Sequence, residues 1–253
     1  FILVTYGVIF VQGLLMWFFY GKGADLSIFP ETQMFYPAAG VMMAYLVTKK
    51  DDKNLPKRFF IFFTLLTAAM ILCSVFSVFI PRTIESGEAE VAVWAMASQV
   101  LIILGSIVFW ILLLASGEEK RSAYGLKGNN WKMSFLYILL FFVLYIVRMG
   151  GASAAGGQIE EFIAVWTEPY TSIYLINLFL NFFLVVTAFF GEEYGWRYYL
   201  QPVMQKHFGL RGGVLLLGIV WGLWHMPLDF FYYTTPDMGL TACVNQQITC
   251  IFM

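Results

Sequence analysis

Residues 59–80 read FFIFFTLLTAAMILCSVFSVFI, a stretch of 22 residues without a charged side chain. An α-helix of about 20 apolar residues crosses the hydrocarbon core of a bilayer, because each residue adds about 1.5 Å. A helix that is apolar on every side is stable inside a protein core or in lipid, but not at a water-exposed surface. This stretch therefore predicts a transmembrane helix.

The rest of the chain repeats the pattern. The 253 residues are 60% hydrophobic and 12% charged, with a mean hydropathy of +0.75, and a soluble fold of this size could not bury that much apolar surface. Further apolar windows cover residues 2–20, 34–48, 91–115, 133–149, 171–191 and 213–231, and another begins near residue 238. Polar segments with turn residues separate them. We predict an all-α, polytopic transmembrane helical bundle of about eight spans, the last of which stops incomplete at Met253.

Lysine and arginine divide unequally between the two sides that these spans define. If successive connections alternate between the sides, 12 of the 15 basic residues lie on one side and only Lys22, Arg82 and Arg148 on the other. Cytoplasmic loops carry the basic excess, so we predict a cytoplasmic N-terminus. We expect an integral protein of a bacterial plasma membrane that contacts the lipid bilayer. The net charge of −1 gives no indication of nucleic-acid binding.

Two adjacent carboxylates and an arginine end the sixth predicted span in FFGEEYGWRYYL, residues 189–200. On a helix Glu193 and Arg197 lie about 40° apart, with the acid first, a spacing that favours an ion pair. Glu192 points roughly 140° away from Arg197. A carboxylate without a partner that faces the inside of a bundle suits a general base. The alternative interpretation is that both glutamates are solvated residues beyond the end of the span.

A histidine lies in the next span, in GIVWGLWHMPLDFF, residues 218–231. Helical geometry places Gly218, Gly222, His225 and Asp229 on one narrow face. Two glycines four residues apart let a neighbouring helix approach closely, and we expect Pro227 to open a kink beside the histidine. The alternative role for His225 is that of a packed, hydrogen-bonding residue.

Glu192 and His225 reach the same depth only if the sixth span continues as a helix past Glu192 to about Leu200, where the following Gln-Pro pair would stop it. On such a helix Gly195, Trp196 and Tyr199 share the side of Glu192. We therefore predict a buried helix end at this point of the chain.

The two motifs together resemble those of a known family. GEEYGWRYYL is similar to the EExxxR motif, and WGLWHMPL to the aromatic-xxx-His motif that follows it, in the CAAX prenyl protease and bacteriocin-processing family of intramembrane proteases, also called Abi proteins. The resemblance implies a multi-span helical fold with a catalytic cavity that opens to the cytoplasm. It also implies that the substrate is a membrane-associated peptide or protein. It further implies that Glu192 activates a water and that His225 stabilises the oxyanion or binds a metal. Zinc is the candidate metal, and a mechanism with the glutamate and no metal stays open. Glu193 and Arg197 would hold the helix end.

The sequence departs from the family pattern at a third motif, His-xxx-Asn or His-xxx-Asp on a later helix. Its two histidines are His207, in a connection, and His225, whereas a catalytic zinc site needs three protein ligands and an open position. We expect a truncated chain in which residues 1–170 form N-terminal transmembrane helices and residues 171–253 form part of a catalytic core. As given it would be inactive, although its parent would be an active protease; a catalytically inactive relative is the alternative.

Other classes of function stay open. A non-catalytic membrane scaffold or immunity-type protein of the same fold would tolerate the loss of the third motif. A transporter would place Glu192, His225 and Asp229 along an ion route, but no inverted repeat is visible. The three cysteines match no usual metal-site spacing, so we expect packing residues, with a disulfide between Cys243 and Cys250 as the alternative.

Overall fold

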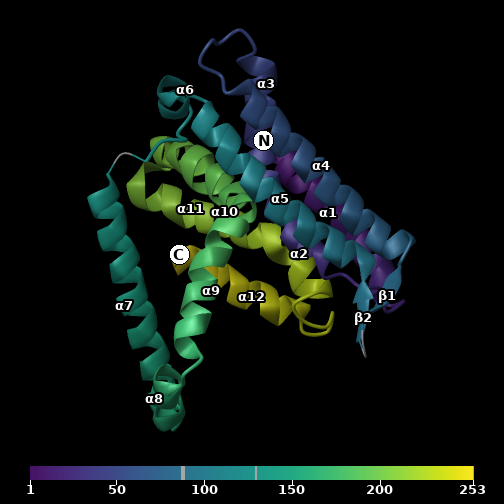
Figure 1. Cartoon of the computed structure of the whole chain (residues 1–253), viewed down its shortest axis with the longest axis vertical. Coiled ribbons are helices and arrows are strands. Elements are labelled where there is room, and N and C mark those ends of the chain that lie inside the picture. The colour runs from purple at the N-terminus through teal and green to yellow at the C-terminus, as the bar shows by residue number, and fades with distance from the viewer. Residues whose placement is uncertain (87–88, 129, 253) are drawn as a thin grey trace. The chain divides into compact units, whose positions relative to one another are not determined.

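The computed structural model describes residues 1–86, 89–128 and 130–252, so Met253, where the eighth predicted span stops, lies outside the described residues. The prediction of an all-α membrane bundle is confirmed (Figure 1). In chain order the elements are the π-helical segment η1 (Leu3–Gly7), α1 (Val8–Tyr20), α2 (Ile28–Gln33), α3 (Tyr36–Thr48), α4 (Lys57–Phe79), β1 (Thr83–Ser86), β2 (Ala89–Ala92), α5 (Val93–Ala115), α6 (Glu118–Ala123), α7 (Trp131–Ala155), α8 (Ile159–Thr167), α9 (Thr171–Leu184), α10 (Val186–Glu193), the π-helical segment η2 (Tyr194–Leu200), α11 (Gln201–Phe231) and α12 (Gly239–Phe252).

Five helical stretches of the described chain are long and apolar enough to cross a membrane. They are Leu3–Tyr20, Lys57–Phe79, Val93–Ala115, Trp131–Ala155 and Val186–Phe231. The second, sixth and eighth predicted spans correspond to shorter helices, because α3 has 13 residues and α9 and α12 have 14 each. The protein is therefore an integral membrane protein that combines long spans with shorter apolar helices.

The chain forms two compact units, one from Phe1–Tyr124 and Leu184–Met253 and the other from Gly125–Phe183. Both motifs lie in the first unit. The functional division at residue 170 stays a prediction, since it concerns chemistry and not compactness.

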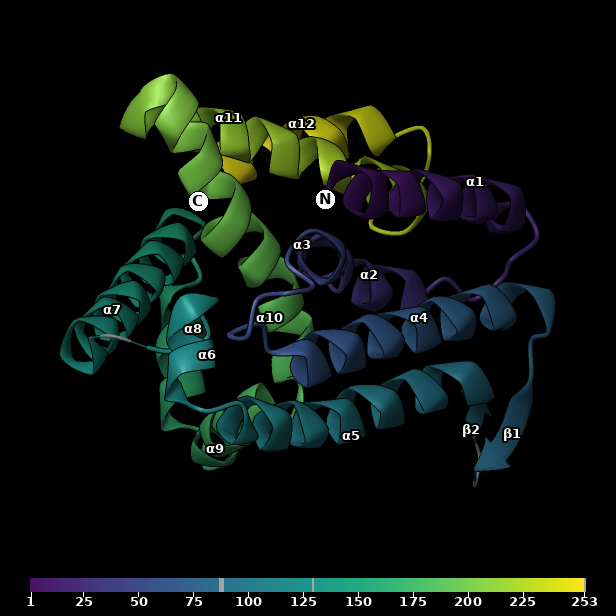
Figure 2. The same ribbon diagram turned by 90° about the horizontal axis from the view of Figure 1, so that it is seen from above.

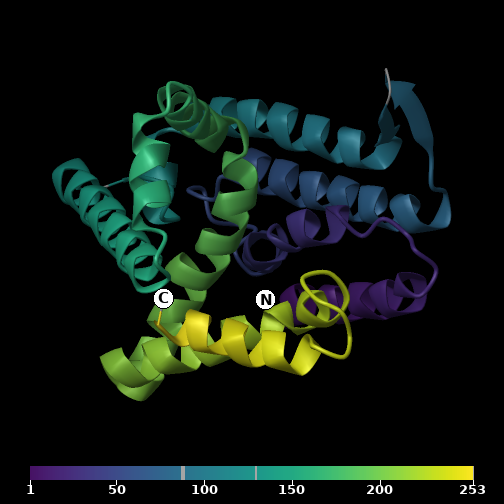
Figure 3. The same cartoon turned by 90° about the horizontal axis from the view of Figure 1, so that it is seen from below.

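Within the first unit, α4 and α5 lie side by side, as Figure 2 shows. Gly105 permits this approach, because a Cβ at Gly105 would lie 2.7 Å from Leu66 Cδ2. The two helices are joined by an antiparallel hairpin of β1 and β2, in which Thr83 is opposite Ala92, where the sequence suggested a plain loop. Figure 3 shows α12 lying along α11, the helix that carries the second motif.

A chain of polar side chains ties three helices of this unit together. The Tyr36 hydroxyl of α3 donates to Gln12 Oε1 of α1, and Gln12 Nε2 donates to Ser74 Oγ of α4 at 2.8 Å. All three side chains are buried. Because lipid offers no hydrogen-bond partners, polar groups inside a membrane protein need partners within it, and this network supplies them.

The second unit holds α7, α8 and most of α9. Helix α7 extends the predicted span 133–149 at both ends and includes Gly150 and Gly151. None of its described residues is buried, so its apolar side chains are available to lipid.

Candidate functional site

The helix that carries the first motif continues past the two glutamates. Helix α10 ends at Glu193, the π-helical segment η2 runs to Leu200, and α11 begins at Gln201 without a break. The prediction of a helix as far as Leu200 is therefore confirmed. π-Helical turns insert one wider turn into a helix and often occur at functional sites. Here the π-helical segment directly follows Glu193, contains Arg197 and ends where α11 begins.

The expected stop at Gln201 and Pro202 is wrong. Pro202 lies in the first turn of α11, where a residue without a backbone N–H costs no hydrogen bond. The break lies at Gly209, which has φ 74° and ψ 169°, a left-handed conformation that glycine adopts readily. Helix α11 keeps helical dihedral angles through Pro227, so the kink lies at Gly209 and not at the proline.

Two glycines press the first motif against the connection between α2 and α3 and against the first turn of α3. A Cβ at Gly191 would collide with the Met34 carbonyl oxygen, and one at Gly195 would collide with Pro37. Both glycines are buried. The backbone on either side of Glu192 is therefore fixed by direct contact with a neighbouring backbone.

The ion pair expected from the sequence is present. Arg197 Nε donates to Glu193 Oε2 at 3.2 Å, and the two side chains are 32% and 53% exposed. Such exposed pairs contribute little to stability. The guanidinium also lies 4.8 Å from the centroid of the Trp221 ring, on α11, so the pair connects the first motif to the second through a cation–π contact.

Glu192 has a different environment. Its side chain is half-buried, and its Oε1 accepts a hydrogen bond of 3.3 Å from the indole Nε1 of Trp221. The other carboxylate oxygen, Oε2, accepts no hydrogen bond from the residues that the structure describes. One oxygen is thus held by an N–H donor, and the second is available to another group.

His225 is bound to the same tryptophan. Its Nδ1 lies 3.0 Å from the Trp221 carbonyl oxygen, one helical turn earlier. A carbonyl can only accept, so Nδ1 carries the hydrogen, and Nε2 of the neutral ring then holds a lone pair. Trp221 therefore links both predicted residues, with its side chain bound to Glu192 and its backbone bound to His225.

Trp221 is a candidate functional residue that the sequence analysis did not single out. It is 4% exposed and stacks on Trp196 of η2, with ring centroids 5.8 Å apart and planes 25° apart. A signal existed, since Trp221 is the aromatic residue of the aromatic-xxx-His motif. Among aromatic residues that fit that position, tryptophan brings an indole N–H that phenylalanine lacks.

The sequence predicted the close approach of a neighbouring helix at the glycine face of α11, and that neighbour is α12. A Cβ at Gly222 would lie 2.7 Å from Gln247 Oε1, and one at Gly218 would lie 2.6 Å from the Cys250 carbonyl oxygen. Gln247 Nε2 donates to the Gly218 carbonyl at 3.0 Å. Asp229, on the same face, is 1% exposed, and its Oδ2 has no hydrogen-bond partner among the described residues.

The described residues do not form a metal-ligand set. No group of three His, Cys, Asp or Glu side chains that could hold a metal occurs in residues 1–86, 89–128 and 130–252. The implied zinc therefore does not fit the donors of this part of the chain, of which His225 is one. Cys73, Cys243 and Cys250 are free thiols, so the disulfide alternative is wrong.

The long apolar helices and the Glu192–Trp221–His225 arrangement define an integral membrane protein with a polar site between its helices. Residues 174–250 match the sequence model of the family described as type II CAAX prenyl endopeptidase Rce1-like. A stretch of 107 residues is 32% identical to CAAX prenyl protease 2 of Methanococcus maripaludis. The aligned stretch covers 42% of this chain and 38% of that protein. No solved structure matches the chain. These matches confirm the resemblance that the two motifs carry.

Proposed function

We propose that this chain carries the general base of an intramembrane endopeptidase, which cleaves membrane-associated peptides or proteins near the membrane surface. The observation that carries the proposal is that one residue, Trp221, binds both the Glu192 carboxylate and the His225 imidazole. The family match of residues 174–250 covers both of these side chains. The relative from Methanococcus is a CAAX prenyl protease by name, which supports a CAAX-type substrate, a peptide with a prenylated cysteine near its C-terminus.

Glu192 is the proposed base. With Oε1 held by the indole N–H, Oε2 accepts a proton from a water whose oxygen attacks the carbonyl carbon of the substrate. The new carbon–oxygen bond converts the carbonyl into a tetrahedral oxyanion. When the carbon–nitrogen bond breaks, the proton on Glu192 passes to the departing amine, and the carboxylate is regenerated.

His225 is the proposed oxyanion partner. Since its Nδ1–H is bound to the Trp221 carbonyl, the ring must also be protonated at Nε2 to donate to a negatively charged oxygen. Glu193 and Arg197 act as positioning residues, because their ion pair lies on the turn after Glu192 and Arg197 covers the Trp221 ring.

The third family motif is not among these 253 residues. We therefore propose that the chain by itself is inactive and that a full reading frame that contains it together with the third motif would be active. This expectation is tested by assaying both in parallel against prenylated and unprenylated forms of one quenched fluorescent peptide. Equal cleavage by both proteins would contradict the need for a third motif.

The base assignment is tested with Glu192→Gln in the full reading frame. Loss of a general base lowers kcat by about 10²–10⁴-fold, whereas a scaffold protein would show no cleavage to lose. The matched control is Glu31→Gln, because Glu31 is also a partly buried carboxylate and is bound to Ser98 and Gln99 away from the site. A Glu192→Gln protein that is folded and cleaves as fast as the Glu31→Gln protein would overturn the proposal.

A further inference from the structure

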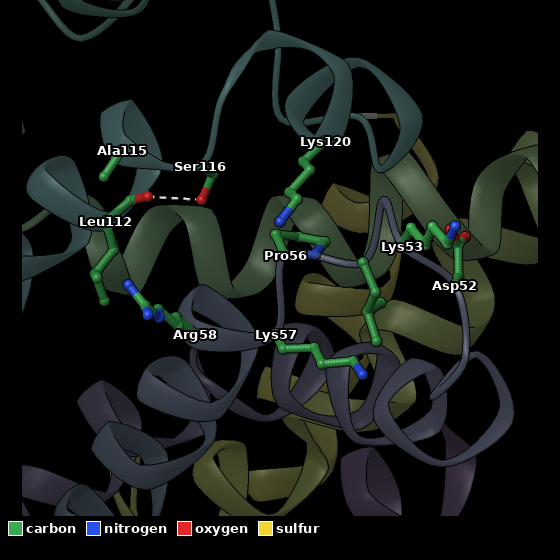
Figure 4. Close-up of a pocket in the computed structure, with 10 residues that line it drawn as sticks. Asp52, Lys53, Pro56, Lys57, Arg58, Leu112, Ala115, Ser116 and Lys120 are labelled. Carbon is green, nitrogen blue, oxygen red and sulfur yellow. Dashed lines mark hydrogen bonds between the residues drawn. The ribbon is translucent and has the colours of Figure 1, made fainter.

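A cavity of about 570 Å³ lies in the first unit, and neither Glu192 nor His225 lines it. It is formed by the segment before α4, the first turn of α4, the end of α5 and one residue of α6. Its lining residues are Asp52, Lys53, Leu55, Pro56, Lys57, Arg58, Leu112, Ala115, Ser116 and Lys120. Figure 4 shows Lys120 reaching from α6 toward Pro56, and Arg58 reaching from α4 toward Leu112.

The charge of the cavity is strongly positive. Its lining has four cations and one carboxylate, and that carboxylate is already bound, because Asp52 accepts from the Tyr124 hydroxyl at 2.7 Å and from the Asn54 backbone N–H at 2.8 Å. Within the part of the chain that the structure describes, none of the four cations forms an ion pair or a side-chain hydrogen bond. Like charges gathered around one cavity repel one another, so an anion between them is stabilising.

The backbone adds to this preference. Among the described residues, no side chain caps the first turn of the 23-residue helix α4. The first N–H groups of a helix and its macrodipole favour negative charge. Ser116 Oγ, on the opposite wall, donates to the Leu112 carbonyl at 2.7 Å, which satisfies an acceptor at the end of α5.

The floor of the cavity is apolar, and its position is that of a membrane interface. Leu55 is 2% exposed, Pro56 is buried, and Leu112 lies on the opposite wall. Helix α4 begins at Lys57 and α5 ends at Ala115, and both are long and apolar enough to span the membrane. The cavity therefore lies where two spans meet water, the level at which phospholipid headgroups lie.

We propose that this cavity binds the phosphate of an anionic phospholipid, with the four cations around the headgroup and the apolar floor against the glycerol and the first acyl carbons. Clustered basic residues at the end of membrane spans bind anionic lipid headgroups. The proposal is independent of the proteolytic function, because no residue of the catalytic site lines the cavity.

The experiment is native mass spectrometry of the detergent-solubilised chain, titrated with phosphatidylglycerol or with phosphatidylcholine of the same acyl composition. The test variant combines Lys53→Gln, Lys57→Gln and Lys120→Gln. The control combines Lys49→Gln, Lys50→Gln and Lys206→Gln, three exposed lysines outside the cavity on the same predicted side of the membrane. None of the six side chains is buried, so both triple variants are expected to fold.

The expected result is preferential binding of one phosphatidylglycerol. A basic residue beside an anionic headgroup strengthens binding roughly five-fold, so the cavity variant loses roughly 100-fold in affinity and the control less than about five-fold. Equal losses in the two variants, or equal binding of phosphatidylcholine, would overturn the proposal. A third arm adds inorganic phosphate alone: if phosphate displaces no lipid, the lipid assignment stands, and if it binds with the affinity of the lipid, the ligand is a free anion and the assignment is wrong.

Discussion

Replacing Trp221 with phenylalanine isolates the hydrogen bond on which the site geometry depends. The substitution removes the indole N–H that donates to Glu192 Oε1 at 3.3 Å. It keeps an aromatic ring opposite Trp196 and leaves the backbone carbonyl that accepts from His225 in place. The change therefore acts on the orientation of the carboxylate and leaves the histidine contact intact.

The magnitude follows from the kind of bond that is lost. Hydrogen bonds to charged groups contribute about 1.5–3 kcal/mol, and a distance of 3.3 Å exceeds the usual 2.9–3.0 Å of an N–H···O bond. We therefore take the lower end, about 1.5 kcal/mol, which corresponds to about a tenfold loss in kcat. KM should change little, because Trp221 is proposed to position the base and not to bind the substrate.

The assay is peptide cleavage by the full reading frame in liposomes, with kcat and KM determined separately. The matched control is Trp224→Phe, which removes another buried indole N–H, one that donates to the Thr5 carbonyl at 3.2 Å and not to Glu192. Both variants should lose a similar amount of thermal stability, but Trp221→Phe alone should lose kcat about tenfold. Equal kcat in the two variants would refute the positioning role of Trp221.

Two further predictions concern stability. Gly195→Ala places a Cβ against the backbone of Pro37 and should lower the stability by about 1–3 kcal/mol, measured as a lower Tm. The control is Gly212→Ala, whose Cβ would lie 3.6 Å from Phe208 Cβ and should leave Tm unchanged. Equal Tm values of the two variants would contradict the close approach at Gly195. Tyr124→Phe removes the hydroxyl that, by its hydrogen bond, holds the pKa of Asp52 below its usual range. A carboxyl group whose pKa is lower in the folded than in the unfolded state stabilises the fold at a pH above its unfolded-state pKa, and this stabilisation is lost as the pH falls through its folded-state pKa. The Tm difference between wild type and variant should therefore shrink from pH 7 toward acid pH. A constant difference would contradict the assignment.

Much of the membrane architecture follows from the sequence because lipid imposes a simple rule. A span must be a helix of sufficient length, so residues 59–80 predict α4 closely. The ion pair of Glu193 and Arg197 was predictable for a similar reason, since residues four apart on a helix meet without any tertiary information. The approach of α12 at Gly218 and Gly222 follows from the absence of side chains on one face.

The helix boundaries were less predictable because they depend on local backbone geometry. The Gln-Pro pair predicts the end of a helix, yet Pro202 fits the first turn of α11. The helical dihedral angles are interrupted instead at Gly209. The sixth predicted span is two helices, α9 and α10, separated at Val185, whose φ of −119° and ψ of 16° are not helical. Nothing in the run of apolar residues around Val185 distinguishes it from its neighbours.

The contact between the motifs required the structure. Helical depth predicts that Glu192 and His225 lie at the same level, but equal depth does not fix which side chains meet. Glu192 is held by α10 and η2, whose glycines Gly191 and Gly195 press on the α2–α3 connection and on the first turn of α3. His225 is held by α11, whose glycines contact α12. The two halves of the site are thus fixed against different neighbours, and the Trp221 indole joins the base to the helix that carries the histidine. A substitution at any of the four glycines should therefore lower activity by moving one half of the site relative to the other. A substitution at Trp221 should lower activity while both halves stay in place.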